Sequence, residues 1–161
     1  MRPANFPTVR IAQFAALIYK SLHLFSQIIE THSVKEIVPL LDVKASSYWD
    51  THVQFDVAQE RATKKSLGKD SVRNIIINTI APIQFLYAAK QDTNKLQEKA
   101  LLLLEAVPAE ENRITRMWEE NGWHAANAAQ SQALLQLYNG YCSNKRCLEC
   151  TIGLNIIRSA S

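Results

Sequence analysis

The sequence has 161 residues, a length that predicts one domain or one domain with a short appendage. Hydrophobic residues make up 47% of the chain and charged residues 20%, which excludes a disordered protein and provides enough apolar side chains for a core. Four glycines and five prolines are few for a barrel or sandwich with many tight turns, so we expect an all-α protein. The formal net charge of +3 is too small to indicate nucleic-acid binding by itself.

Apolar residues at helical spacing predict an irregular bundle of about six helices. These are expected from near Thr8 to about Ile28, then at Ser33–Leu41, Val72–Leu86, Thr93–Val107, Glu110–Asn121 and Asn127–Asn139. Side chains of Thr8, Ser33 and either Asp70 or Ser71 are expected to cap the first three helices. Gly122 is expected to end the fifth helix in the left-handed conformation. The first and third helices should form the centre of the fold.

The helical periodicity fails between residues 42 and 69, and this long loop begins with aromatic side chains. Asp50, His52 and Asp56 lie close together here, and such groups can bind a divalent cation or act in acid–base chemistry. Alternatively, Tyr48 and Trp49 anchor the loop while the polar side chains stabilise its turns. The structural alternative is favoured, because no second acid–base cluster and no enzyme motif is present in the sequence.

The loop ends in a basic segment with a net charge of +3, so the rest of the chain is balanced, with 13 basic against 13 acidic residues. Its basic residues are Arg61, Lys64, Lys65, Lys69 and Arg73, against Glu60 and Asp70. These side chains could neutralise nucleic-acid phosphates, although a solvated loop is the simpler interpretation.

Three cysteines, Cys142, Cys147 and Cys150, form the most distinctive local motif. Their spacing could provide most of a four-ligand zinc shell, with His124 the nearest candidate for the fourth ligand and His52 or His32 reachable through folding. We expect the neighbouring Lys145 and Arg146 to lower the pKa of the thiols and so favour metal binding.

Two alternatives to zinc remain open for this cluster. The cysteine loop resembles that of endonuclease-three-type glycosylases, which implies an iron–sulfur cluster, but Ile156 stands where a further cysteine is needed. The simplest alternative is three reduced cysteines in a tight turn with no bound metal. An odd number of cysteines within nine residues is typical of a reducing compartment, so a cytoplasmic location is expected. No stretch is apolar enough to predict a membrane span.

Several motifs in order carry a resemblance to a known family. They are Arg2-Pro3-x-Asn5-Phe6-Pro7, Tyr48-Trp49-Asp50-x-His52, Leu67-Gly68-Lys69, Asn74–Thr79, and Ser131–Leu134 followed by the three cysteines. Together the chain resembles the C-terminal region of a bacterial family known as domain-of-unknown-function family 2851. The resemblance implies a longer N-terminal region, absent here, which is itself similar to a restriction-endonuclease-type nuclease core. Catalytic carboxylates would then lie in that region, so no residue of this chain inherits a catalytic role.

We therefore expect one helical domain over residues 1–161, with a linker-like start at 1–7 and a cysteine loop and tail at 142–161. The expected function is a non-catalytic accessory domain that packs on or orients the separate N-terminal domain. An apolar face left uncovered by the absence of that domain could also drive self-association. The alternative function is a nucleic-acid-binding module that uses the basic segment.

Overall fold

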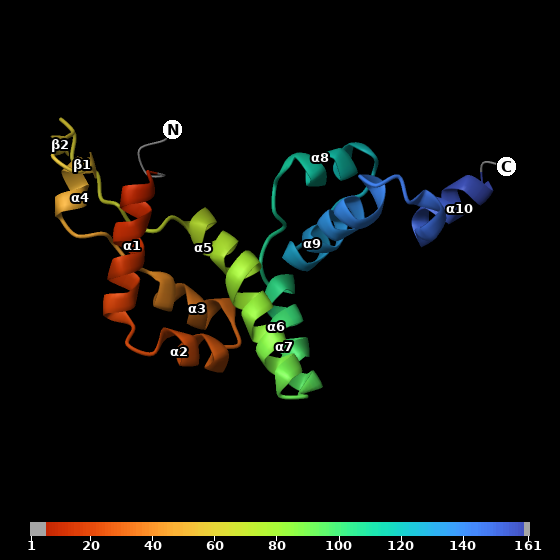
Figure 1. Ribbon diagram of the computed structural model, residues 1–161, viewed down its shortest axis with the longest axis horizontal. Coiled ribbons are helices and arrows are strands. Elements are labelled where there is room, and N and C mark those ends of the chain that lie inside the picture. Colours follow the sequence, from red (N-terminus) through yellow and green to blue (C-terminus); the bar gives the residue numbers. More distant parts are fainter. Residues whose placement is uncertain (1–5, 160–161) are drawn as a thin grey trace. The chain divides into compact units, whose positions relative to one another are not determined.

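The computed structural model describes residues 6–159, and this part of the chain is mostly helical, which confirms the expected fold class (Figure 1). The chain divides into two compact units, Met1–Leu103 and Leu104–Ser161. The expectation of one domain over residues 1–161 stays a prediction. Within residues 6–159, no helix is long and apolar enough to cross a bilayer.

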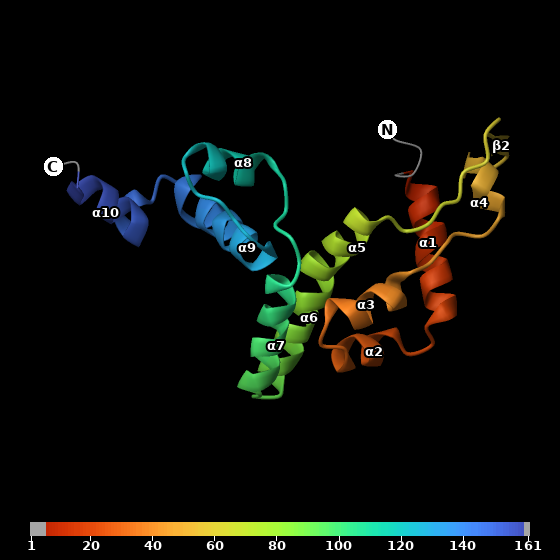
Figure 2. The same cartoon turned by 180° about the vertical axis from the view of Figure 1, so that it is seen from behind.

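The first unit contains helices and one small hairpin. Its elements in order are α1 (Pro7–Lys20), α2 (Leu24–Glu30), α3 (Val34–Leu41), α4 (Tyr48–Thr51), β1 (His52–Gln54), β2 (Val57–Ala58), α5 (Lys69–Ile75), the π-helix η2 (Ile76–Ile80), α6 (Ala81–Lys90) and α7 (Asn94–Glu105), whose last two residues fall in the second unit. β1 and β2 pair antiparallel. α6 and α7 lie side by side in both views, joined by a short turn (Figure 2).

Two groups of buried side chains stabilise this unit. One joins α1 to the hairpin region and consists of Val9, Ala45, Trp49 and Val53, with Phe6 and Ala12 packed against it. The other contains the largest fully buried apolar side chains of α3 and of the α5–α6 segment, which are Ile37, Leu41, Ile76 and Ile80. α3 and the segment from α5 to α6 therefore supply the largest buried side chains of the first unit, whereas α1 buries Val9, Gln13 and Leu17 and exposes much of its apolar face.

Of the predicted helix N-caps, the structure confirms Ser33 but not Thr8, Asp70 or Ser71. Ser33 caps α3 and accepts a hydrogen bond from the backbone N–H of Glu36. Thr8 does not cap α1, because its hydroxyl donates instead to the carbonyl of Val53 and so links α1 to β1. Asp70 and Ser71 do not cap α5 either, since the helix begins one residue earlier and its N-cap is Gly68.

The first predicted helix is two helices, because the chain bends after Lys20. Ser21 is buried at this point, and α2 starts only at Leu24. The ammonium of Lys20 donates to the carbonyls of Pro39 (2.9 Å) and Asp42 (2.8 Å), which ties the end of α1 to the end of α3. The bend follows from these distant contacts, which apolar periodicity does not encode.

The second unit contains α8 (Arg113–Glu120), α9 (Ala128–Leu137), the π-helix η3 (Tyr138–Cys142), the 3-10 turn η4 (Cys147–Glu149) and α10 (Thr151–Ser159). Gly122 has a φ of 84° and ends α8 as predicted, with its N–H donating to the carbonyl of Glu119. Asn127 caps α9 by accepting from the N–H of Gln130. The tail after Cys150, expected only as a loop and tail, forms α10.

Candidate functional site

An open pocket of about 690 Å³ lies in the first unit between α1 and α5. Its lining residues are Arg10, Gln13, Phe14 and Leu17 from α1, Val43, Ser66, Leu67 and Gly68 from the connecting segments, and Asp70, Ser71, Asn74 and Ile75 from α5. The pocket thus combines a polar wall with apolar side chains. Such a combination suits binding of an apolar group whose orientation is set by a few polar contacts.

The polar wall is held in place by two side chains of α1. Arg10 donates to the amide oxygen of Gln13 (3.0 Å) and to the hydroxyl of Ser71 (3.0 Å). Gln13 is 3% exposed, and its Nε2 donates to the carbonyls of Lys65 and Ser66, both at 3.1 Å. These bonds join α1 to a segment more than fifty residues later and hold the polar wall of the pocket in place.

An apolar face of α1 continues outward from this pocket. Ile11, Phe14 and Ile18 follow one another at intervals of three and four residues, and they are 67%, 62% and 47% exposed. The opposite face of the same helix carries Val9, Gln13 and Leu17, which are buried. α1 is therefore apolar on two sides, and only one of them is covered in the described part of the chain. An exposed apolar stripe at this spacing is typical of a surface that packs on another protein element.

The residues of the predicted nucleic-acid-binding segment differ in their exposure to solvent. Lys65 is only 4% exposed, so its side chain is not available to an extended phosphate backbone. Arg61, Lys64 and Lys69 are exposed, and exposed Arg73 forms an ion pair with Asp70 at 3.4 Å. Four of the five predicted residues are thus exposed: Arg61 and Lys64 lie between β2 and α5, and Lys69 and Arg73 lie on α5.

The candidate acid–base group in the loop has structural partners. Asp50 pairs with Lys44 (2.8 Å), and this bond lowers the pKa of the Asp50 carboxyl below its usual range. The ring of His52 stacks on Tyr48, with ring centroids 4.1 Å apart, and its Nδ1 lies 2.8 Å from the carbonyl oxygen of Tyr48. The N–H of Asp56 donates to the hydroxyl of Tyr48. These contacts support the structural interpretation of the loop.

The three cysteines of the second unit line one pocket of about 320 Å³. Cys142 and Cys147 are exposed, whereas Cys150 is buried. Burial first, and then the charges of Cys150 and Cys147, raise the pKa of the Cys142 thiol. The expectation that Lys145 and Arg146 lower it is therefore wrong for Cys142, and the guanidinium of Arg146 is instead bound to Glu149.

The candidate fourth metal ligand lies apart from the thiols. His124 is not among the residues that line the cysteine pocket, and its Nδ1 lies 3.2 Å from the carboxylate of Glu119. Among residues 6–159, no group of three or more histidine, cysteine, aspartate or glutamate side chains is arranged to hold a metal ion. The zinc and iron–sulfur hypotheses gain no geometric support, and they stay predictions.

The family model of the proteins of unknown function called DUF2851 matches residues 1–113. The chain belongs to the DUF2851 family. No curated protein and no solved structure matches it. The DUF2851 match includes the pocket beside α1, the apolar face of that helix and the basic segment, whereas the three cysteines lie beyond it.

Sequence reasoning missed the pocket and the residues that form its polar wall. A signal was present, because Arg10 and Gln13 are polar residues three positions apart in an otherwise apolar stretch. Their partners, however, are Ser71 and the carbonyls of residues 65 and 66, which are far away in the sequence. Only the tertiary structure could identify the pocket.

Proposed function

We propose that this DUF2851 chain is a non-catalytic helical interaction domain that packs on a separate domain of the same protein through α1. The observation that carries the proposal is the exposed apolar stripe of Ile11, Phe14 and Ile18. The partner proposed is the N-terminal region that the family resemblance implies, and the chain is proposed to represent the C-terminal region of the family.

The pocket supports the same assignment. It lies next to Phe14, and its polar wall is held by bonds from Arg10 and Gln13. A partner that inserts an apolar side chain there would also cover the stripe on α1. Burial of one large apolar side chain contributes about 1.5–3 kcal/mol, so each residue of the stripe can contribute measurably to such a contact.

The proposal can be tested by calorimetric titration of this chain with the N-terminal region of a longer family member, produced as a separate polypeptide. We expect saturable binding that the Phe14→Ser substitution weakens about tenfold or more, because about 1.4 kcal/mol corresponds to a factor of ten. Leu86→Ser is the matched control, since Leu86 is 63% exposed on α6 and Phe14 is 62% exposed on α1. Absence of binding, or equal effects of the two substitutions, would contradict the proposal.

A second candidate function is nucleic-acid binding by the exposed members of the basic segment. Four exposed basic residues support it: Arg61 and Lys64 between β2 and α5, and Lys69 and Arg73 on α5. Neutralised phosphates release counterions, so the affinity should fall steeply with salt concentration. The test is fluorescence anisotropy with labelled duplex DNA and the double variant Lys64→Ala, Lys69→Ala.

The control for that test is the double variant Lys90→Ala, Lys95→Ala, which removes the same charge from exposed positions at the turn between α6 and α7. If the basic segment binds DNA, the first variant lowers both the affinity and its dependence on salt, and the control does not. Equal effects of the two variants would indicate only a general effect of net charge.

A further inference from the structure

The cysteine pocket of the second unit has no part in the proposed interaction surface, and its chemistry points to a separate role. Its wall is mainly apolar and aromatic around the three thiols. The lining residues besides the cysteines are Met117, Trp118, Asn121, Trp123, Leu137, Tyr141, Ile152, Gly153 and Ile156. One buried and two exposed thiols line this pocket, and solvent-exposed thiols can react with disulfides.

The backbone brings Cys147 and Cys150 together on one turn. Cys147 begins the 3-10 turn η4, and the N–H of Cys150 donates to the carbonyl of Cys147 at 3.3 Å. A 3-10 helix rises about 2.0 Å per residue and eclipses side chains three positions apart, which places the two Cα atoms about 6 Å apart. Disulfides span Cα separations of about 4.4–6.8 Å, so the backbone separation of this pair is within the range of a disulfide.

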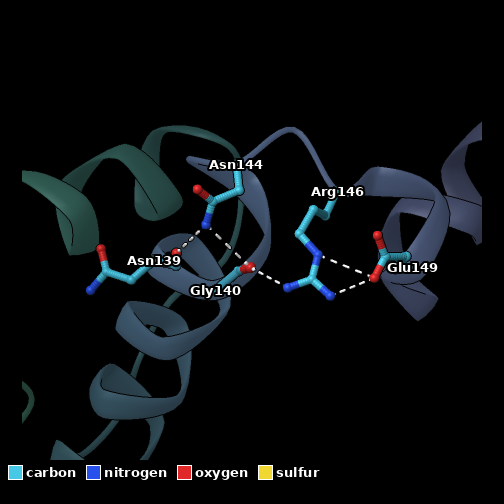
Figure 3. A network of polar contacts seen from close by, with 5 residues as sticks. All are labelled: Asn139, Gly140, Asn144, Arg146 and Glu149. Carbon is cyan, nitrogen blue, oxygen red and sulfur yellow. Dashed lines mark hydrogen bonds and ion pairs between the residues drawn. The ribbon is translucent and has the colours of Figure 1, made fainter.

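A network of polar contacts holds this turn against the end of η3 (Figure 3). The guanidinium of Arg146 binds the carboxylate of Glu149 and reaches the carbonyl of Gly140 at 3.5 Å. The amide of Asn144 donates to the carbonyl of Asn139 at 2.9 Å. Since these bonds already order the backbone on both sides of Cys147, closing a disulfide there costs little further conformational entropy.

We propose that Cys147 and Cys150 form a reversible disulfide by exchange with a low-molecular-weight disulfide such as oxidised glutathione. The exposed Cys147, as thiolate, attacks one sulfur of the oxidised glutathione, forms a mixed disulfide and releases one glutathione thiolate. The Cys150 sulfur then attacks the Cys147 sulfur of the mixed disulfide and releases the second glutathione. The two protein thiols lose two electrons to the glutathione disulfide, and their two protons end on the two released glutathiones.

Cys142 remains a thiol in this proposal. It lies on η3, whereas Cys147 and Cys150 share the backbone hydrogen bond of the 3-10 helix η4. Burial first, and then the charges of Cys150 and Cys147, raise the pKa of the Cys142 thiol, which lowers its thiolate fraction and slows its attack on a disulfide. Cys142 therefore takes no part in the disulfide, and Cys147 and Cys150 form a two-thiol redox site.

The experiment is equilibration of the whole chain with mixtures of reduced and oxidised glutathione, followed by acid quenching, alkylation and mass spectrometry. We expect two of the three thiols to be lost as oxidised glutathione increases and to be recovered with dithiothreitol. Digestion with trypsin and an endoproteinase specific for glutamate cleaves after Arg146 and Glu149. The peptides Cys147–Glu149 and Cys150–Arg158 should therefore be found linked by a disulfide.

Single substitutions identify the pair independently. Cys142→Ser should still lose two thiols, whereas Cys147→Ser and Cys150→Ala should retain both remaining thiols or stop at a glutathione adduct. Circular dichroism checks that each variant is folded, and peptide mapping of the unsubstituted chain decides the question if Cys150→Ala is not. A disulfide that includes Cys142, or three thiols that stay free under strongly oxidising glutathione, would overturn the proposal.

Discussion

Gly153 offers a sharp test of how the C-terminal helix is held in place. It is the third residue of α10, and a Cβ atom at this position would lie 2.5 Å from the carbonyl oxygen of Cys147 and 3.1 Å from its Cα. Both are backbone atoms, which cannot rotate away as a side chain can. We therefore expect Gly153→Ala to displace the start of α10 from the 3-10 turn.

The expected magnitude combines two opposite effects. Replacing glycine with alanine inside a helix favours folding by about 1 kcal/mol, because glycine has the greater conformational freedom when unfolded. Overpacking against fixed atoms costs about 1–3 kcal/mol, and a 2.5 Å approach lies at the upper end of that range. The net result should be a destabilisation of the α10 contact by about 1–2 kcal/mol.

Gly140→Ala is the matched control in the same unit. A Cβ atom there would meet only the flexible amide nitrogen of Gln136 at 3.8 Å, an ordinary contact distance. This substitution should leave the stability of the unit unchanged or raise it by about 0.4–1 kcal/mol. The two variants differ in their surroundings and not in chemistry, so their comparison isolates the close approach at Gly153.

Hydrogen exchange measured by mass spectrometry is the suitable assay, because it reports the opening of α10 separately from the rest of the chain. In Gly153→Ala, peptides that cover residues 147–159 should exchange about tenfold faster, as a loss of 1.4 kcal/mol implies. Peptides from the first unit should be unchanged. Exchange in α10 equal to that of the unsubstituted chain would refute the argument that Gly153 is needed for the close packing of α10 on Cys147.

Four further predictions follow from contacts described above. Gln13→Leu should destabilise the first unit by about 1–3 kcal/mol in urea unfolding, because the carbonyl of Ser66 loses its side-chain donor; no change would show that the pocket wall does not depend on this amide. Ser33→Ala should cost about 1 kcal/mol by loss of the α3 cap, and increased exchange confined to α3 would distinguish this from a general effect. The hydrogen bond from Lys44 lowers the pKa of the Asp50 carboxyl, so the pair should stabilise the fold at pH values above the ordinary pKa range of a carboxyl group. This stabilisation should be lost as the pH falls through the lowered pKa of Asp50. Asp50→Asn should therefore remove this part of the pH dependence of the urea midpoint. A chelator should leave the unfolding of the second unit unchanged, and a lowered midpoint would instead support the predicted zinc site.

Features that depend on neighbouring residues could be predicted from the order of the amino acids. The apolar spacing indicated a helical fold, and Ser33, Gly122 and Asn127 end or begin helices where expected. Each of these residues acts on backbone groups within five positions of itself. The type of residue is then sufficient to predict a helix end, because the backbone groups left unpaired at the first and last turns of a helix are the same in every protein.

Tertiary structure decided the features that depend on distant partners. Lysine is usually a surface residue, but Lys65 is buried, and its carbonyl accepts a hydrogen bond from Gln13 of α1. Thr8 has the position of a cap but its hydroxyl binds the carbonyl of Val53. The 690 Å³ pocket exists only because α1 meets a segment more than fifty residues later. These hydrogen-bond partners depend on which surfaces pack together, because a buried polar group bonds to the partner that packing brings close to it. The spacing of residues along the chain does not specify that partner.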